Sequence, residues 1–325
     1  MPTTAMAAAA ASPVDFGEVR SGLAAAVVHD TVYLAGGHSG ESPLKLFEAF
    51  EPSGDPEDRG DWKKLEPLLA RRAYCSAAVH GDSVFIIGGS ADGRSLNTIE
   101  VYDSAKREWA DWYTRMPMHV KRTLHQSCVA KGRLFVCGGF DGMRDLASME
   151  ELDLTSHSWK WSTQMERPRS YFALCSCGDD LYAIGGQDRR GHEDDPRAHS
   201  SVDRFELFSE LWFPAAPLLR GRVGCAAATL LLDGKPHIFV CGGSDGSETL
   251  TSMERYDPVA NAWVEVAPMS QHRLGHAVAV VENRLYAIGG FDGKEPLGNF
   301  ECYDPDQDRW TSPAKMGASL AVGDE

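Results

Sequence analysis

The 325 residues are 43% hydrophobic and 24% charged and contain no apolar run near the roughly 18 residues of a membrane-spanning helix, which predicts a soluble chain of one or two domains. Lys and Arg number 32 against 47 Asp and Glu, and the net charge of -15 disfavours nucleic acid and anionic membranes as partners. Eight cysteines with no C-x-x-C pair and no secretory signal ahead of them favour a reducing, cytoplasmic location.

The chain begins with an Ala-rich stretch, residues 1–13, which lacks the basic residues of a signal peptide and is expected to be a disordered lead-in. Beyond it, Gly-Gly pairs begin at positions 36, 88, 138, 185, 242 and 289, at steps of 52, 50, 47, 57 and 47 residues. A period of about fifty residues is the signature of a repeat architecture. Residues 14–325 are therefore predicted to contain six copies of one unit.

Each unit shows the same order of elements. An Arg at a turn precedes strand a, and a short apolar strand b ends in the Gly-Gly pair, as expected for strands buried between layers. Strand c carries an acid, which is Glu48, Glu100, Glu150, Asp203, Glu254 or Glu301. Strand d carries a Trp, which is Trp62, Trp109, Trp159, Trp212, Trp263 or Trp310. The units span about 20–70, 71–120, 121–167, 168–219, 220–271 and 272–316.

A sheet of four antiparallel strands with two apolar faces cannot bury both of them alone, and six such sheets closed into a ring leave only short edges exposed. The sequence therefore predicts an all-β fold, a six-bladed β-propeller of four-stranded antiparallel blades, in one domain. The Gly pairs open no helix and are followed by no P-loop Lys, so we expect them to supply positive φ or close strand approach near the axis rather than nucleotide binding. The Cys are expected to be small buried hydrophobes, and no Cys-His pair is singled out.

The residues resemble kelch repeats, whose signature is the Gly-Gly pair, the spaced Tyr and Trp, and a trailing Pro-Met and Arg. The stretch from Ser252 through Pro268-Met269 to Gly293 is very similar to the kelch domains of BTB-kelch substrate adaptors, and the resemblance covers about residues 14–316. It implies a non-catalytic, monomeric disc that binds a peptide or protein, as in relatives that act with cullin-type ubiquitin ligases. The stretch before Arg20 is too short for a BTB or F-box domain, so a ligase role would need another subunit or segment.

An enzyme is the alternative that the resemblance leaves open, because some kelch-type propellers isomerise or oxidise sugars. Such a site needs convergent His, Tyr, Arg or Glu, or a copper centre, and no such set is evident in the repeat. We therefore expect no catalytic residue, cofactor or metal.

Four insertions depart from the repeat, and all four are expected in loops. They fall between c and d (51–61), d and the next Arg (113–121), b and c (187–200), and a and b (230–236). In the family that the chain resembles, the b-c and d-a loops form the ligand-binding face, so 113–121 and 187–200 are expected there. Residues 187–200 contain two His and four acids but lack the compact spacing of a zinc site, which favours a recognition loop over a metal site.

Three sets of residues are the candidate binding residues. An Arg at each d-a turn either pairs with the acid of strand c as a structural staple or contributes to a positive mouth for a ligand. These residues are Arg20, Arg72, Arg122, Arg169, Arg222 and Arg273. By resemblance, ligand contacts come from the residue after each Arg, namely Ser21, Ala73, Thr123, Ser170, Val223 and Leu274. They also come from the residue after each Gly pair, namely His38, Ser90, Phe140, Gln187, Ser244 and Phe291.

The second and third sets contain no Arg, which argues against a strongly acidic ligand. Phe140 and Phe291 either anchor a partner or pack over the base of their own loops. Each unit has its own four strands, so closing the ring requires no borrowed strand, and the tail 317–325 pairs with the first unit or with nothing.

Overall fold

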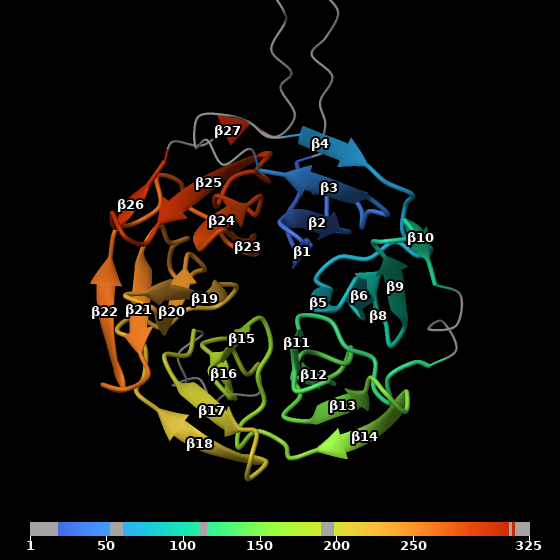
Figure 1. Cartoon of the computed structure of the whole chain (residues 1–325), viewed down its shortest axis with the longest axis horizontal. Coiled ribbons are helices and arrows are strands. Elements are labelled where there is room, and N and C mark those ends of the chain that lie inside the picture. The colour runs from blue at the N-terminus through green and yellow to red at the C-terminus, as the bar shows by residue number, and fades with distance from the viewer. Residues whose placement is uncertain (1–18, 53–60, 111–115, 190–197, 312–313, 316–325) are drawn as a thin grey trace, which may run out of the picture.

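Each repeat unit folds as one antiparallel sheet whose strands run in chain order from the axis outwards, and six such sheets form a ring (Figure 1). The computed structural model describes residues 19–52, 61–110, 116–189, 198–311 and 314–315. The expected lead-in, residues 1–13, lies outside the described residues, as does the tail 317–325. The structure confirms the six-bladed β-propeller of four-stranded antiparallel blades.

The strands of the six blades have the following bounds. Blade 1 contains β1 (Ala24–Val28), β2 (Thr31–Ala35), β3 (Phe47–Glu51) and β4 (Asp61–Lys64). Blade 2 contains β5 (Ser76–His80), β6 (Ser83–Ile87), β9 (Ile99–Asp103) and β10 (Glu108–Trp109), with the small hairpin β7 (Ser90–Ala91) and β8 (Arg94–Ser95) in its b-c loop. Blade 3 contains β11 (Gln126–Ala130), β12 (Arg133–Cys137), β13 (Met149–Asp153) and β14 (Ser158–Ser162).

Blades 4 to 6 follow the same order. Blade 4 contains β15 (Ala173–Cys177), β16 (Asp180–Ile184), β17 (Val202–Glu206) and β18 (Leu211–Ala215). Blade 5 contains β19 (Ala226–Leu232), β20 (Lys235–Cys241), β21 (Met253–Asp257) and β22 (Ala262–Val266). Blade 6 contains β23 (Ala277–Val281), β24 (Arg284–Ile288), β25 (Asn299–Asp304), β26 (Arg309–Trp310) and β27 (Ala314–Lys315).

One insertion is not a loop. The expectation that residues 230–236 avoid the strands is wrong, because β19 and β20 pair from Ala226 opposite Cys241 out to Leu232 opposite Lys235. The extra residues lengthen this a-b hairpin to seven residues on each side, with Asp233 and Gly234 forming the turn at positive φ. A hairpin absorbs such an insertion because each added pair of residues also adds ladder hydrogen bonds.

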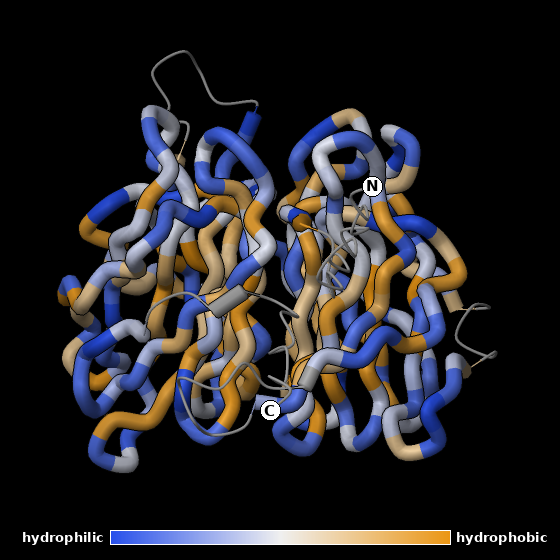
Figure 2. The backbone as a smooth tube through the Cα atoms, turned by 90° about the horizontal axis from the view of Figure 1, so that it is seen from above, coloured by the Kyte–Doolittle hydropathy of each residue, from blue (hydrophilic) through white to orange (hydrophobic). Residues whose placement is uncertain are grey.

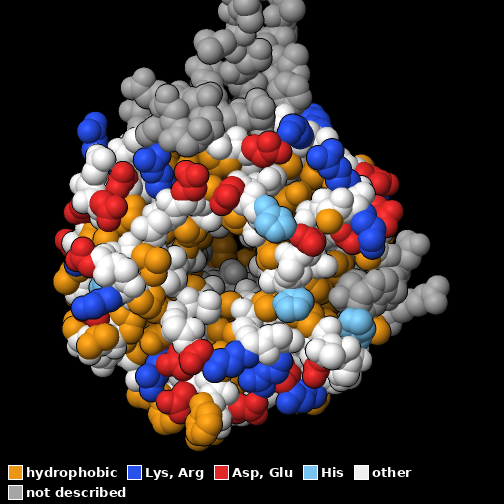
Figure 3. Space-filling view, viewed as in Figure 1, with side chains coloured by type: hydrophobic (Ala, Val, Ile, Leu, Met, Phe, Trp, Pro, Cys, Tyr) orange, Lys and Arg blue, Asp and Glu red, His pale blue; other side chains and the backbone are white. Residues whose placement is uncertain are grey.

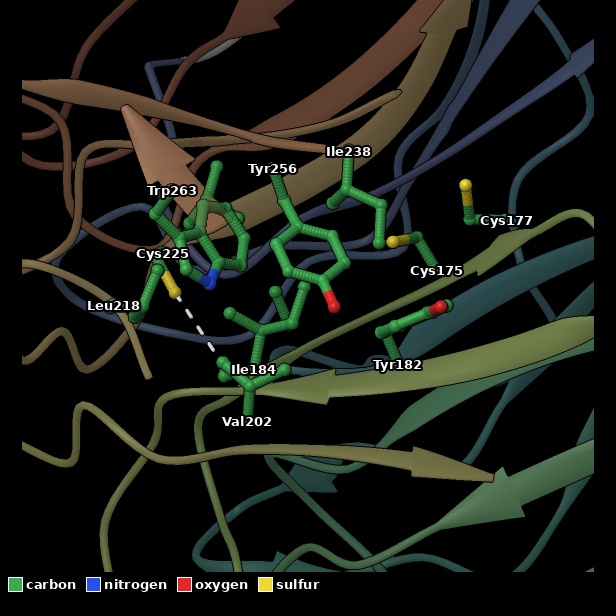
Figure 4. Close-up of a cluster of buried hydrophobic side chains, with 12 residues drawn as sticks. Cys175, Cys177, Tyr182, Ile184, Val202, Leu218, Cys225, Ile238, Tyr256 and Trp263 are labelled. Atoms are coloured by element: carbon green, nitrogen blue, oxygen red, sulfur yellow. Dashed lines mark hydrogen bonds between the residues drawn. The ribbon is translucent and has the colours of Figure 1, made fainter. Parts of the chain in front are cut away.

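The core lies between the blades rather than within them. Each of the six interfaces buries its own hydrophobic cluster, because both faces of every sheet carry apolar side chains. At the interface of blades 4 and 5, side chains from both sheets face one another (Figure 4), among them Tyr182, Ile184, Ile238 and Tyr256. The hydrophobic segments consequently run through the middle of the disc, and hydrophilic loops cover its two faces (Figure 2).

The repeated Trp joins neighbouring blades. In five blades its indole N–H donates to a backbone carbonyl of the segment that follows strand d of the preceding blade. The pairs are Trp109 with Glu66 (3.0 Å), Trp159 with Met116 (3.1 Å), Trp212 with Thr163 (2.8 Å), Trp263 with Ala216 (2.8 Å) and Trp310 with Ala267 (2.9 Å). Each of these five indole N–H groups thereby gains a hydrogen-bond partner in the neighbouring blade, which is consistent with the near-constant spacing of the Trp in the sequence.

The ring closes where blade 6 meets blade 1, and among the described residues no blade borrows a strand from another. Leu34 and Phe50 of blade 1 share one cluster with Ile288 and Phe300 of blade 6. The backbone N–H of Gly290 donates to the carbonyl of Arg20 (3.1 Å), which repeats the link between every other pair of neighbouring blades. Within the described residues there is no helix that is long and apolar enough to cross a membrane.

Candidate protein-binding face

One face of the disc carries the b-c and d-a loops, and this loop face holds all the candidate binding residues. Because strands alternate in direction, the a-b and c-d turns emerge on the opposite face. Figure 3 shows the disc along its axis, with hydrophobic atoms at the central hollow and charged side chains of both signs around it. The inner strands of all six blades line an axial cavity of about 150 Å³.

The six repeated Arg are structural. Their side chains are at most 1% exposed, and each pairs with the acid of strand c in its own blade. Arg122 shows the pattern: its guanidinium donates to Glu150 (2.8 Å) and to the carbonyls of Gly138 (2.7 Å) and Ser148 (3.0 Å), so it joins the two ends of the b-c loop. The prediction that Arg20, Arg72, Arg122, Arg169, Arg222 and Arg273 present a positive mouth to a ligand is corrected, because buried, paired guanidinium groups do not reach a surface partner.

The acid of strand c also fixes the d-a loop. Glu150 accepts the backbone N–H groups of His119 (2.7 Å) and Val120 (3.2 Å), besides its bond from Arg122. The same acid position receives loop N–H groups in blades 2, 5 and 6. In blades 2, 3, 5 and 6 the Arg–acid pair therefore holds one b-c loop and one d-a loop, which makes the base of these loops rigid.

The Gly pairs place neighbouring blades in contact. Both glycines of every pair have positive φ. A Cβ on Gly36 would lie 2.2 Å from the Arg72 carbonyl oxygen of the next blade, and one on Gly185 would lie 2.5 Å from that of Arg222. The N–H of the second Gly donates to this same carbonyl at all six interfaces, at 2.7 to 3.1 Å. Both predicted roles, positive φ and close approach, are confirmed.

A ring of six backbone hydrogen bonds surrounds the axis at the loop face, and no motif in the sequence indicates it. The residue two positions after each Arg donates its N–H to the equivalent residue of a neighbouring blade, at 2.7 to 3.0 Å. The ring members are Gly22, Tyr74, Leu124, Tyr171, Gly224 and Gly275, all of which have positive φ. Three of them are non-glycine residues in a conformation that costs about 1 kcal/mol each.

Tyr74 and Tyr171 cover the axis inside this ring. Their ring centroids lie 5.9 Å apart in an edge-to-face arrangement. A Cβ on Gly22 would lie 2.6 Å from the Tyr74 ring, and one on Gly275 would lie 2.3 Å from the Tyr171 hydroxyl oxygen. The two tyrosines therefore fill the space that the glycines leave free, and only about 50 Å³ of cavity remains beside them. Burial raises the pKa of Tyr171 far above its ordinary value, so the phenol stays neutral.

The two sets of predicted loop-tip residues lie together in pairs. In every blade the residue after the Arg forms a β-bridge with the residue after the Gly pair. The pairs are Ser21 with His38, Ala73 with Ser90, Thr123 with Phe140, Ser170 with Gln187, Val223 with Ser244, and Leu274 with Phe291. All six residues of the Gly-pair set are partly exposed. Of the Arg set, only Ser21 and Leu274 are partly exposed. The predicted contact role of the other four is therefore corrected, because the side chains of Ala73, Thr123, Ser170 and Val223 are buried.

A cross-blade contact covers Phe140. The Arg189 guanidinium lies over its ring, 4.5 Å from the centroid. The backbone N–H of Arg189 donates to the carboxylate of Asp145 (2.6 Å), which is buried in the loop of blade 3. Phe140 thus packs within the loop face under a cation, which is a cation–π contact in a fixed position.

Parts of the two loop-face insertions are described. In 113–121, His119 stacks on Trp161, with ring centroids 5.1 Å apart, and Trp161 is 54% exposed at the edge of the face. In 187–200, residues 190–197 lie outside the described residues, so the recognition-loop prediction there remains a prediction. Among the described residues no group of three or more His, Cys, Asp or Glu is placed to hold a metal ion. Residues 53–60 of the c-d insertion also lie outside.

Comparison with known proteins decides the family. A family model described as the KLHDC2/KLHL20/DRC7 Kelch-repeats domain matches residues 74–273, and the Kelch motif matches residues 20–68 and 272–317. The chain belongs to the kelch-repeat family. Kelch-like protein 35 of Mus musculus is 32% identical over 118 residues, which cover 36% of this chain and 18% of the relative. Kelch-like protein 23 of Mus musculus is 26% identical over 258 residues, covering 78% of this chain and 42% of the relative.

The kelch chain thus spans less than half the length of these curated relatives. A solved structure titled "Structure of YjhT" superposes on it with a TM-score of 0.76 at 14% sequence identity, covering 92% of this chain and 99% of the other. At that identity the likeness extends to the fold alone.

Two buried histidines of the kelch disc contact nucleophile-type side chains near the axis. His125 Nε2 lies 3.0 Å from the Ser76 hydroxyl, and His276 Nε2 lies 3.3 Å from the Cys241 thiol. Burial, with help from nearby Arg, lowers the pKa of both imidazoles to about 3, and burial raises the pKa of the Cys241 thiol to about 12. A thiol that stays protonated, out of contact with solvent, is the opposite of an activated nucleophile.

A hollow of about 530 Å³ lies between blades 5 and 6 on the loop face of the kelch disc. Its lining is polar and includes Ser247, Gln271, His272 and Lys294. The Gln271 side-chain oxygen accepts from Arg273 (3.4 Å) and Asn299 (2.8 Å), which leaves its amide N–H groups for other partners. The loop face therefore offers half-exposed tips of mixed chemistry around a closed centre.

Proposed function

We propose that this kelch propeller is a non-catalytic interaction module that binds a peptide or protein partner on its loop face. One observation carries the proposal: six equivalent, partly exposed loop-tip positions stand on one repeated scaffold, and their side chains differ in type. They are His38, Ser90, Phe140, Gln187, Ser244 and Phe291. Loops held by a rigid frame are the usual carriers of recognition.

The frame supports binding by being ordered before the partner arrives. The buried Arg–acid pairs fix the loop bases, and the backbone ring fixes the blades around the axis. A preorganised surface has less conformational entropy to lose on binding. Because Tyr74 and Tyr171 cover the axis, we propose that the partner lies across this face rather than threading the channel.

The finer proposal is a substrate-recognition role in a cullin-type ubiquitin ligase, in the cytoplasm. Its support is the family, which includes a Danio rerio relative named Kelch repeat and BTB domain-containing protein 8, 32% identical over 119 residues, 35% of this chain and 19% of the relative. The linking BTB or F-box unit would come from another subunit or segment. Immunoprecipitation from cells and probing for a cullin tests this role, and a cullin-free complex would contradict it.

A matched pair of substitutions in blade 5 tests the binding face. Ser244→Arg adds a long charged side chain at a loop-face tip, whereas Val259→Arg adds the same side chain to the opposite face, at a residue that is 93% exposed. Peptides selected from a displayed random library on the purified protein should lose at least about tenfold in affinity for Ser244→Arg, because a contacting tip contributes on the order of 1–2 kcal/mol.

Calorimetric titration measures these affinities, and thermal melting checks that both variants fold. Affinity loss confined to Val259→Arg, or shared equally by both variants, would place the site elsewhere. Turnover of any compound in a panel of sugars would contradict the non-catalytic proposal.

A further inference from the structure

Neighbouring b-c loops touch at one repeated point. Positions are counted from the second Gly of each pair. At four interfaces, the residue at position +6 of one blade lies next to the residue at position +3 of the next blade. Asp145 accepts the backbone N–H of Arg189 (2.6 Å). In the three other cases a Cβ added to the glycine would lie 3.3 to 4.0 Å from the partner side chain, which is Ser95 for Gly142, Thr249 for Gly293 and Pro296 for Gly40. Gly40 of blade 1 therefore has the same position relative to blade 6 that Arg189 of blade 4 has relative to blade 3.

The same correspondence relates the two Phe tips. Phe140 and Phe291 each follow a Gly pair, and each bridges to a d-a residue and to the contact residue just described, Asp145 or Pro296. Over Phe140 lies the guanidinium of Arg189, 4.5 Å from the ring centroid. The residue of blade 1 that corresponds in repeat position to Arg189 is Gly40, which has no side chain, and among the described residues no Lys or Arg forms a cation–π contact with Phe291.

The charges around Phe291 favour a cation. Glu41 follows Gly40 in the loop of blade 1, and Asp292 and Glu295 lie in the loop of blade 6; the two Glu are exposed and Asp292 is partly exposed. Lys294 lies in the same loop, so Glu41 and residues 292–295 together carry three acids and one Lys and are net negative. The whole chain carries -15, and six of its Arg are already paired in the interior. Such a surface attracts positively charged partners over a distance of about a Debye length.

We propose that the Phe291 ring, next to Gly40 and flanked by Glu41 and Glu295, is a subsite for an arginine side chain of the partner. The guanidinium would stack on Phe291 as Arg189 stacks on Phe140, with the two Glu around it. Arginine suits the subsite better than lysine, because a planar, weakly hydrated guanidinium stacks on an aromatic face. This inference rests on the proposed function and adds a chemical class of partner: a basic segment that contains arginine.

Peptides selected from the displayed random library test the subsite. We expect an arginine at one position, and replacing it by citrulline, which has the same shape without the charge, should weaken binding about 5- to 30-fold, the equivalent of a cation–π contact of about 1–2 kcal/mol. Phe291→Leu should abolish this difference between the two peptides, whereas Phe291→Trp should keep it. Phe208→Leu is the matched control: this Phe is 96% exposed in the c-d turn of blade 4, on the opposite face, and its loss should leave the difference unchanged.

Three results distinguish failure of the arginine subsite from failure of the proposed binding on the loop face. Peptides that bind the loop face, as judged by their sensitivity to Ser244→Arg, but tolerate citrulline would overturn the arginine subsite and leave the proposed function standing. An unchanged citrulline effect in a folded Phe291→Leu variant would overturn the subsite too. If no selected peptide is sensitive to Ser244→Arg, both proposals fail.

Discussion

At the residue scale, the Arg, the Gly pair and the acid recur in the same order in each unit because they form one repeated set of hydrogen bonds. The Arg122 guanidinium, the Gly138 carbonyl and the Glu150 carboxylate form a single buried network. Neither ion is accessible to water, so each depends on the other for the interactions that it loses on folding. Of the two interpretations that the sequence permits for the Arg, burial selects the structural one.

Arg122→Ala should therefore destabilise the fold by about 3–5 kcal/mol, because it leaves the Glu150 carboxylate buried with one fewer partner. Lys121→Ala is the neighbouring control: this side chain is exposed, and its loss should change the free energy of unfolding by less than about 0.5 kcal/mol. Urea denaturation of both variants measures the difference. An Arg122→Ala protein as stable as the control would mean that the pair contributes little to folding.

At the element scale, the six d-a loops differ in what they place at the axis. Blades 5, 6 and 1 supply Gly224, Gly275 and Gly22, while blades 2 and 4 supply the two Tyr that lie over them. The closure of the channel is thus a property of several loops together. The backbone conformation is the same in all six, and the side chains decide which part of the ring is filled.

Gly275→Ala tests this packing against Gly81→Ala. Both glycines have positive φ, but a Cβ on Gly275 meets the Tyr171 hydroxyl at 2.3 Å, whereas a Cβ on Gly81 meets nothing within 4 Å. Both substitutions should lose about 1 kcal/mol to backbone strain, and Gly275→Ala should lose about 1–3 kcal/mol more to overpacking.

A double-mutant cycle identifies the source of the extra loss. In a Tyr171→Ala background the cost of Gly275→Ala should fall to that of Gly81→Ala, as measured by chemical denaturation. An equal cost of the two alanine substitutions in the otherwise unchanged protein would show that the Tyr171 ring does not rest on Gly275.

At the scale of the whole molecule, the six blades are linked by interface clusters, Trp bonds and two sets of backbone hydrogen bonds that run around the ring. His125 and His276 lie inside this assembly, at the interfaces of blades 2 with 3 and 5 with 6. Phe172 occupies the equivalent position in blade 4, where it is also fully buried. Protonating either imidazole would place an uncompensated charge in the interior.

Stability should consequently fall in mild acid. Burial lowers the pKa of His125 and His276 from 6.5 to about 3 in the folded state, so the unfolded chain binds more protons between these two values. The free energy of unfolding therefore rises with pH across this window. When the pH falls from 7 to 5, it should decrease by roughly 2 kcal/mol per histidine, because each pH unit below 6.5 costs about 1.4 kcal/mol.

Denaturation at pH 7 and pH 5 measures this loss. His276→Phe, which copies the residue found in blade 4, should remove about half of it, whereas replacing the exposed His80 by Ala should leave the loss unchanged. If the His276→Phe protein still shows the full loss of stability between pH 7 and pH 5, groups other than His276 cause that loss.

The linear sequence was sufficient for the fold, because a spacing of about fifty residues between Gly pairs, with an Arg, an acid and a Trp at fixed offsets, specifies one blade repeated six times. Those offsets are set by the packing of side chains at the interface between two neighbouring blades, and the same packing recurs at each interface. The tertiary structure alone decided the state of the candidate site: that the six Arg are buried, that Thr123 and Ser170 lie beneath the loops, and that a hairpin absorbed one insertion. Burial depends on contacts between units, whereas the lengthened hairpin lies within blade 5. The pairing of Phe140 with Arg189 arises only when blade 3 meets blade 4, and the approach of Gly40 to Pro296 arises only when blade 6 meets blade 1.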